Sequence, residues 1–131
     1  AGFVTTKAAV FIGIMASLVC YLAVHLKNKL GWDDALDVWG VHGVGGVLGG
    51  IMLGIFGTTA VNAAGANGLY HGNPAFFGKR VAAVFATAAY AFVFSYAALY
   101  VINWFTPVKT TEKEEEAGMD EALHGETAYL H

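Results

Sequence analysis

Three long apolar runs, at residues 8–26, 38–57 and 81–105, constrain the fold of this chain more than any other feature. A helix needs about 20 apolar residues to cross the hydrocarbon layer of a bilayer. The second run has no ionisable side chain except His42, and the third has none beyond its tyrosines. The sequence therefore predicts an all-α membrane protein with three transmembrane helices at about these positions.

The composition indicates the same lipid environment. Of the 131 residues, 56% are hydrophobic and only 13% are charged, so the chain cannot bury its apolar surface by itself. We expect residues 1–105 to form the membrane part and residues 106–131 to form a cytoplasmic tail. The single cysteine, Cys20, lies within the first run and has no disulfide partner. A lipid bilayer is therefore the first expected partner.

Charge is distributed unevenly along the chain, whose formal net charge is −3. Three spans would place the loop at residues 27–37 and the tail on one side of the membrane, and all ten carboxylates fall there. The lysines and arginines, which set orientation, divide four on that side against three on the other. This small excess favours a cytoplasmic tail, and the expected location is the cell (inner) membrane.

The predicted three-helix unit lacks surfaces that would shield a polar group on a helix face. We therefore expect further helices or other subunits around it. The chain starts with loop-like residues 1–6, without a methionine and without the basic segment of a signal peptide. These features predict that the chain is a piece of a longer protein.

Seven glycines between residues 43 and 57 share an arc of roughly 180° on a helical wheel that also contains His42. Small residues at four-residue spacing, as in Gly46, Gly50 and Gly54, let neighbouring helices approach closely in lipid. We favour such helix packing over a ligand cradle. A phosphate-binding loop is further disfavoured, because no Lys-Ser/Thr pair follows these glycines.

The ring of His42 is costly inside an otherwise uncharged span, and it therefore predicts a functional site. An equally weighted interpretation is that the ring only bridges two helices through hydrogen bonds. Val38 precedes His42 by four residues on the same helical face, so a lumen beside His42 would next meet an apolar constriction. We expect Asp37 to cap this helix through its side-chain oxygen rather than to bind a substrate cation, although both uses are open.

Two segments resemble motifs of a known transporter family. The run at residues 33–46 reads DDALDVWGVHGVGG and closely resembles the tenth-helix signature of the Amt/Mep/Rh ammonium transporters. The segment at residues 118–129 reads GMDEALHGETAY and resembles the cytoplasmic tail motif of the Amt branch. The resemblance covers essentially the whole chain and implies the last three of eleven helices of such a transporter, followed by its tail.

The resemblance also implies a role for His42. This residue matches the second of two histidines that face each other in the family's pore, and the first comes from an earlier helix outside this chain. Ammonium cannot enter an apolar lumen as a hydrated ion, because desolvating an unpaired charge is prohibitive. A histidine can accept and relay the proton. The implied function is conduction of ammonium or ammonia through a narrow apolar pore lined by His42 and Val38.

The resemblance further implies a regulatory tail, whose motif residues are Gly118, Asp120, His124, Gly125, Glu126 and Tyr129. It implies a homotrimer in which the tails couple the subunits and offer a surface to a PII-type regulatory protein. Plant relatives carry a phosphorylated threonine two positions before the motif histidine, but Ala122 stands there in this chain. A phosphorylation switch of that kind is therefore unsupported.

Two other functions stay open on the sequence alone. The first is a membrane cytochrome subunit, in which His25 and His42, both toward the same leaflet, would be the axial ligands of a haem. The second is a purely structural oligomerisation segment. The spans contain no paired carboxylates and no Ser-His or Cys-His pair. We therefore expect a non-enzymatic protein without catalytic residues, metal site or cofactor, and without a nucleic-acid partner.

Overall fold

The computed structural model describes residues 2–126, and these form helices and loops without a strand. Helix α1 (Thr6–Leu30) is followed by a π-helical segment, η1 (Trp39–Val44), which continues directly as α2 (Gly45–Phe56). The third long helix is α3 (Pro74–Ile102). The prediction of an all-α chain is confirmed. Three helical segments of the described chain, namely α1, the joined η1 and α2, and α3, are each long and apolar enough to cross a membrane.

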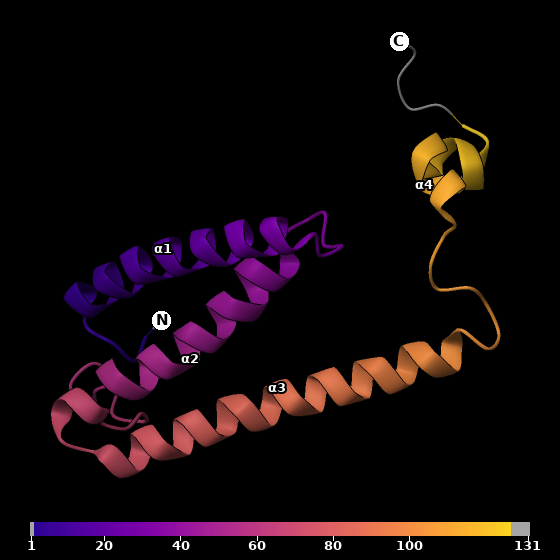
Figure 1. Ribbon diagram of the computed structural model, residues 1–131. Coiled ribbons are helices and arrows are strands. Elements are labelled where there is room, and N and C mark those ends of the chain that lie inside the picture. The colour runs from indigo at the N-terminus through magenta and orange to yellow at the C-terminus, as the bar shows by residue number, and fades with distance from the viewer. Residues whose placement is uncertain (1, 127–131) are drawn as a thin grey trace. The chain divides into compact units, whose positions relative to one another are not determined.

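The chain divides into two compact units, Ala1–Ala89 and Tyr90–His131, whose boundary falls within α3. In the first unit, α1 lies against η1 and α2 as a helical hairpin, and Figure 1 shows the loop that joins them at one end. A short 3-10 turn, η2 (Leu69–His71), precedes α3. The second unit contains the short helix α4 (Glu112–Ala117) and a π-turn, η3 (Asp120–His124).

Both ends of α1 follow from local sequence signals. The hydroxyl of Thr5 accepts a hydrogen bond from the backbone N–H of Ala8 (3.3 Å) and thereby caps the first turn. At the other end Gly31 adopts a left-handed conformation (φ 66°), which glycine takes without steric cost. The backbone N–H of Trp32 donates to the carbonyl of Lys27 (3.3 Å), as in a Schellman motif. This termination turns the chain sharply into the acidic loop.

Helix α3 begins earlier than the hydrophobic pattern predicts. Its first residue is Pro74 rather than a residue near 81, and the side chain of Asn73 accepts a hydrogen bond from the N–H of Phe76 (3.0 Å). Proline is favoured at a first helical position because its missing N–H would have no partner there. Because α3 begins at Pro74, Lys79 and Arg80 lie in its second turn. Long cationic side chains are tolerated near the end of a membrane helix, since they can reach polar surroundings from there.

The connection between α2 and α3 is folded closely against the end of α2. The N–H of Gly68 donates to the carbonyl of Gly57 (2.8 Å), and the N–H of Thr58 donates to that of Phe3 (2.9 Å). A Cβ at Gly68 would collide with the backbone carbonyl oxygen of Ile55. Only glycine fits this close approach, so the loop is anchored rather than loose.

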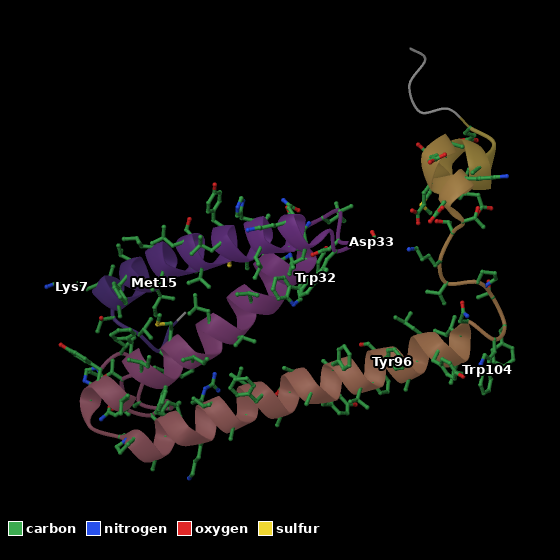
Figure 2. All side chains as sticks on the ribbon, in the orientation of Figure 1. Lys7, Met15, Trp32, Asp33, Tyr96 and Trp104 are labelled. Carbon is green, nitrogen blue, oxygen red and sulfur yellow. The ribbon has the colours of Figure 1, made fainter. Side chains whose placement is uncertain are left out.

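Most of the helical surface is exposed within this chain. Among the described residues the buried apolar side chains are Ala23 and Met52, and no residue of α3 is buried. Figure 2 shows side chains such as Tyr96 and Trp104 projecting from α3 and the turn after it. Apolar helices with so little internal burial require lipid or further protein around them.

Candidate functional site

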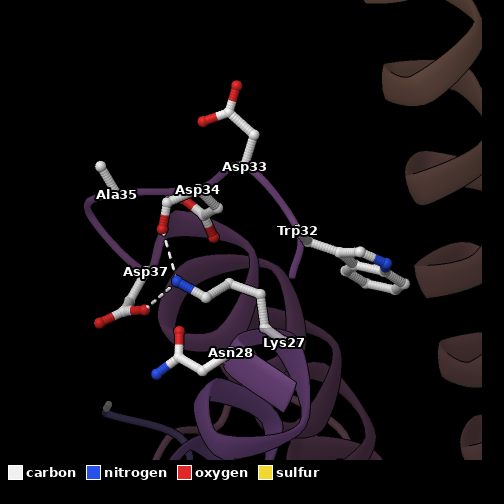
Figure 3. Close-up of a pocket in the computed structure, with 7 residues that line it drawn as sticks. All are labelled: Lys27, Asn28, Trp32, Asp33, Asp34, Ala35 and Asp37. Carbon is white, nitrogen blue, oxygen red and sulfur yellow. Dashed lines mark hydrogen bonds and ion pairs between the residues drawn. The ribbon is translucent and has the colours of Figure 1, made fainter. Parts of the chain in front are cut away.

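A buried lysine organises the loop between α1 and η1. Lys27 lies in the last turn of α1 and is only 4% exposed. Its ammonium donates to the backbone carbonyl of Asp34 and to Oδ1 of Asp37, both at 2.5 Å (Figure 3). An unpaired buried ammonium would be costly, and these two acceptors offset that cost. The loop is therefore folded around one cation.

The side-chain cap of the second span comes from Asp34, which corrects the expectation for Asp37. The two carboxylate oxygens of Asp34 accept hydrogen bonds from the backbone N–H groups of Val38 and Trp39, each at 2.9 Å. Asp37 instead adopts a left-handed backbone conformation (φ 55°), and its carboxylate forms the ion pair with Lys27. Aspartate tolerates that conformation better than most residues. Sequence spacing does not reveal this backbone turn.

His42 lies in the π-helical segment η1, directly after this cap. π-helical turns are rare and frequently mark functional sites, because they shift side chains out of the α-helical register. The side chain of His42 is exposed, and it forms no hydrogen bond within residues 2–126. Val38, just before the turn, is 49% exposed. The structure thus places both predicted pore residues on surface that the described part of this chain leaves uncovered.

One set of glycines in the second span lies in close contact with neighbouring helices. We call it the tight glycine face: Gly40, Gly45, Gly50 and Gly54. A Cβ at Gly40 would lie 2.7 Å from Cγ2 of Val24 in α1, and one at Gly50 would lie 2.5 Å from Cγ2 of Val84 in α3. Both distances are far below van der Waals contact. The predicted close helix packing is therefore present on this face.

A second set of glycines faces empty space. We call it the open glycine face: Gly43, Gly46 and Gly49. A Cβ at Gly46 or Gly49 would meet no atom within 4 Å, and one at Gly43 would meet only the ring of Trp39 at 3.8 Å. Gly46 and Gly49 follow His42 by four and seven residues, and Gly45 of the tight face follows it by three. The open glycines therefore form a stripe of bare backbone in the same span as His42, next to the tight ones.

Two hollows lie outside this stripe. The larger, of about 430 Å³, lies beside the acidic loop and is lined by Lys27, Asn28, Trp32, Asp33, Asp34, Ala35 and Asp37. The other, of about 280 Å³, lies near the opposite end of α2 and is lined by Phe3, Leu53, Ala64, Gly65, Ala66, Phe76 and Arg80. His42 lines neither hollow.

The first unit contains two further histidines, His25 and His71. His25 is exposed on α1, and the ring of His71 in η2 stands edge-on to that of Tyr70 at 5.2 Å. His131 lies outside the described residues. Within residues 2–126 there is no cluster of three or more histidine, cysteine or acidic side chains placed to hold a metal ion.

The tail begins with a capping box. The hydroxyl of Thr111 accepts from the N–H of Glu114 (3.4 Å), and the carboxylate of Glu114 accepts from the N–H and the hydroxyl of Thr111 (2.7 and 2.8 Å). These hydrogen bonds, the one from the backbone first, hold the pKa of Glu114 below its usual value. The motif residues follow this helix.

The structure describes most of the tail motif. Gly118 (φ 92°) and Gly125 (φ 64°) have left-handed backbones, and they flank η3. Asp120 begins η3 and His124 ends it. The N–H of Glu126 donates to the carbonyl of Asp120 (3.2 Å), which closes the turn. Tyr129, the last predicted tail residue, lies outside the described residues.

Lys27 and Asp34 are the residues that the sequence analysis missed. In the sequence, Lys27 is one of the positive charges that favour a cytoplasmic tail, and Asp34 is one of the three aspartates in the loop at residues 27–37. A lysine in the last turn of a helix, followed within ten residues by three aspartates, is the signal that would have indicated this cluster. Burial of the lysine itself has no signature in the sequence.

Comparisons with known proteins show the family to which this chain is similar. The model of the Ammonium Transporter Family matches residues 1–129. The ammonium transporter of Bacillus subtilis is 45% identical over 130 residues, and ammonium transporter Amt1 of Archaeoglobus fulgidus is 38% identical over 129. Each alignment covers 98% of this chain and 32% of the relative. The chain thus spans about a third of the length of these relatives.

A solved structure shows the same fold. The crystal structure of Saccharomyces cerevisiae Mep2 matches with a TM-score of 0.78 and 31% sequence identity, over 86% of this chain and 27% of that one. The family model covers the acidic loop, the second span and all of the tail motif at residues 118–129. This chain belongs to the ammonium transporter family.

Proposed function

We propose that this chain forms part of an ammonium-conducting pore in which His42 relays a proton. The complete transporter, in this proposal, consists of the chain together with helices supplied from outside it, for a total of eleven. Family membership supports this assignment, since the chain aligns with about a third of each relative, 32% for the Bacillus subtilis ammonium transporter. Helices with almost no internal burial need such partners.

The observation that carries the proposal is the position of His42. It is the one ionisable side chain between residues 38 and 57, it is exposed, and it has no hydrogen-bond partner within residues 2–126, while Gly43, Gly46 and Gly49 nearby leave the backbone bare. Bare backbone beside a titratable ring leaves room for a small solute and for a second ring from another helix. The proton that ammonium must lose in an apolar lumen then has an acceptor.

Other interpretations of His42 have less support. A ring that bridged helices of this chain would be hydrogen-bonded between them, and the ring of His42 has no hydrogen-bond partner within the described residues. The haem alternative, with His25 and His42 as axial ligands, receives no support from a family whose relatives are ammonium transporters. The proposal therefore treats the exposed ring as one that meets a partner outside this chain.

The rest of the proposal concerns assembly and surroundings. Val38 forms the apolar constriction next to His42, on the side of the acidic loop, and Asp37 lies at the mouth of the pore. The complete transporter is a homotrimer in the cell membrane, with the tail in the cytoplasm as a surface for a PII-type regulatory protein. The resemblance of the tail to the Amt motif supports this part, together with the family match through residue 129.

The test compares two histidine variants of the complete transporter. His42→Ala should lower methylammonium current by at least about tenfold, because proton transfer by a positioned side chain commonly contributes a factor of this size or more. The matched control is His25→Ala, which removes an exposed histidine from the end of α1 and should leave the current unchanged. Membrane levels of both variants are measured alongside.

The outcomes separate the competing functions. An undiminished and equally selective current in His42→Ala would refute the relay. Equal losses in both variants, together with a Soret band in the purified protein, would support a haem site instead. A loss confined to His42→Ala, in protein without pigment, supports transport.

A further inference from the structure

We infer that Lys27 is a positioning residue for His42, acting through the acidic loop. The inference rests on the proposed function, because it concerns where the relay ring is held. Lys27 has no route to a pore solute of its own: its ammonium is occupied by Asp34 and Asp37, and its side chain is 6% exposed. The structure instead connects it to the start of the helix that carries the ring.

The connection consists of consecutive hydrogen bonds. Lys27 holds the carbonyl of Asp34 at 2.5 Å, and the carboxylate of the same residue holds the N–H groups of Val38 and Trp39 at 2.9 Å. Lys27 also holds the carboxylate of Asp37, whose carbonyl accepts from the N–H of Val41 at 2.9 Å. Two branches therefore run from one ammonium into the turn that contains His42.

The positive charge of Lys27 is required to hold the acidic loop in its observed conformation. Asp37 has a left-handed backbone, which is uncommon for a residue other than glycine and needs a contact to hold it. Without the ammonium, the carboxylates of Asp34 and Asp37 would repel each other in the same short loop. The loop would then relax, and the π-turn would lose both of its anchors.

A rigid support lies on the other side of Lys27. Its backbone belongs to α1, and α1 lies against η1 so closely that a Cβ at Gly40 would lie 2.7 Å from Val24. Lys27 is thus fixed by a helix that already contacts the turn it anchors. In Figure 3 its ammonium reaches up from α1 to lie between Asp34 and Asp37. The geometry is that of a brace between two packed helices.

The first arm of the test measures the turn directly, in the complete transporter. Lys27→Met keeps an apolar stem and removes the charge. Its matched control is Lys29→Met, which removes an exposed lysine from the same last turn of α1. In Lys27→Met the amides of Val38, Trp39 and Val41 should exchange with deuterium at least about tenfold faster, because their acceptors are released. They should be unchanged in Lys29→Met.

The second arm asks whether Lys27 acts through His42. Lys27→Met should lower methylammonium current in the wild-type background and add no further loss to the residual current of His42→Ala. Equal fractional losses in both backgrounds would overturn the inference, since Lys27 would then act independently of the ring. Lys27→Arg, which keeps the charge, should recover part of the current.

The two arms distinguish failure of the inference from failure of the proposed function. If His42→Ala conducts normally, the relay is refuted, and the exchange arm alone judges the brace: faster exchange supports it and unchanged exchange overturns it. If Lys27→Met does not reach the membrane, Asp37→Asn takes its place, because it weakens one branch and leaves the Asp34 carbonyl bound. Unchanged exchange of the Val41 amide in Asp37→Asn would also overturn the inference.

Discussion

The tight and open glycine faces belong to the same span, but glycine has a different effect on each. On the tight face the missing Cβ lets the backbone of α1 approach Gly40, and at Gly50 it makes room for the side chain of Val84 in α3. On the open face, a Cβ at Gly46 or Gly49 would meet no neighbouring segment of the described chain within 4 Å. The comparison teaches that a glycine-rich span can combine packed glycines with glycines that leave the backbone bare.

The largest expected effect on stability is at Gly40. In Gly40→Ala the new Cβ would lie 2.7 Å from Cγ2 and 3.1 Å from the backbone nitrogen of Val24. A backbone atom cannot move aside as a flexible side chain can, so overpacking should cost about 1–3 kcal/mol. The measurement is the melting temperature of the complete transporter in detergent.

The control for Gly40→Ala is Gly46→Ala, which adds the same methyl group to the open face. No atom lies within 4 Å of that Cβ, and alanine is the better helix former. Stability should be unchanged or slightly raised. Equal melting temperatures for the two variants would break the comparison, because they would show that the two faces do not differ in packing.

A larger side chain on the open face should separate transport from stability. Gly46→Leu adds a larger side chain four residues after His42, at a position where a Cβ would meet no neighbouring segment of the described chain within 4 Å. We expect methylammonium current to fall by about tenfold, as obstruction beside the ring raises the barrier by about 1.4 kcal/mol. Stability should stay within about 0.5 kcal/mol, which is typical of substitutions away from packed features.

The opposite pattern for Gly46→Leu would be equally informative. A loss of stability as large as that of Gly40→Ala, with normal current in the remaining folded protein, would mean that a helix from outside this chain lies directly on Gly46. The open face would then be a second packing surface. His42 would have no cleared stripe beside it.

The two faces also show how far sequence alone reaches. The three apolar runs predict the three helices because segment length and hydropathy are local properties. A wheel at a constant turn angle puts all seven glycines between residues 43 and 57 on one arc with His42. It cannot divide them, because the division depends on where α1 and α3 lie and on the π-turn at residues 39–44.

The acidic loop shows the same limit more sharply. Aspartate before an apolar run correctly predicts a carboxylate cap, but the cap comes from Asp34 rather than Asp37. The reason is the left-handed backbone of Asp37, which depends on its pairing with Lys27 ten residues earlier. The start of α3 was missed differently: Asn73 and Pro74 were visible signals, yet the charges at Lys79 and Arg80 masked them. Contacts, rather than residue types, decide such positions.

The smallest expected effect tests the mildest contact of the tight face. In Gly45→Ala the new Cβ would lie 3.0 Å from Sγ of Cys20, which is the end of a short side chain and can shift. The loss of stability should therefore stay below about 1 kcal/mol, less than at Gly40. Adding Cys20→Ala removes the sulfur and should restore most of that loss, although Cys20→Ala alone gives up a weak contact with the carbonyl of Val41. Melting temperatures of the two single variants and the double variant form a cycle. Strict additivity would show that Gly45 does not pack against Cys20, and Gly40 would then be the one glycine of the tight face that packs against α1.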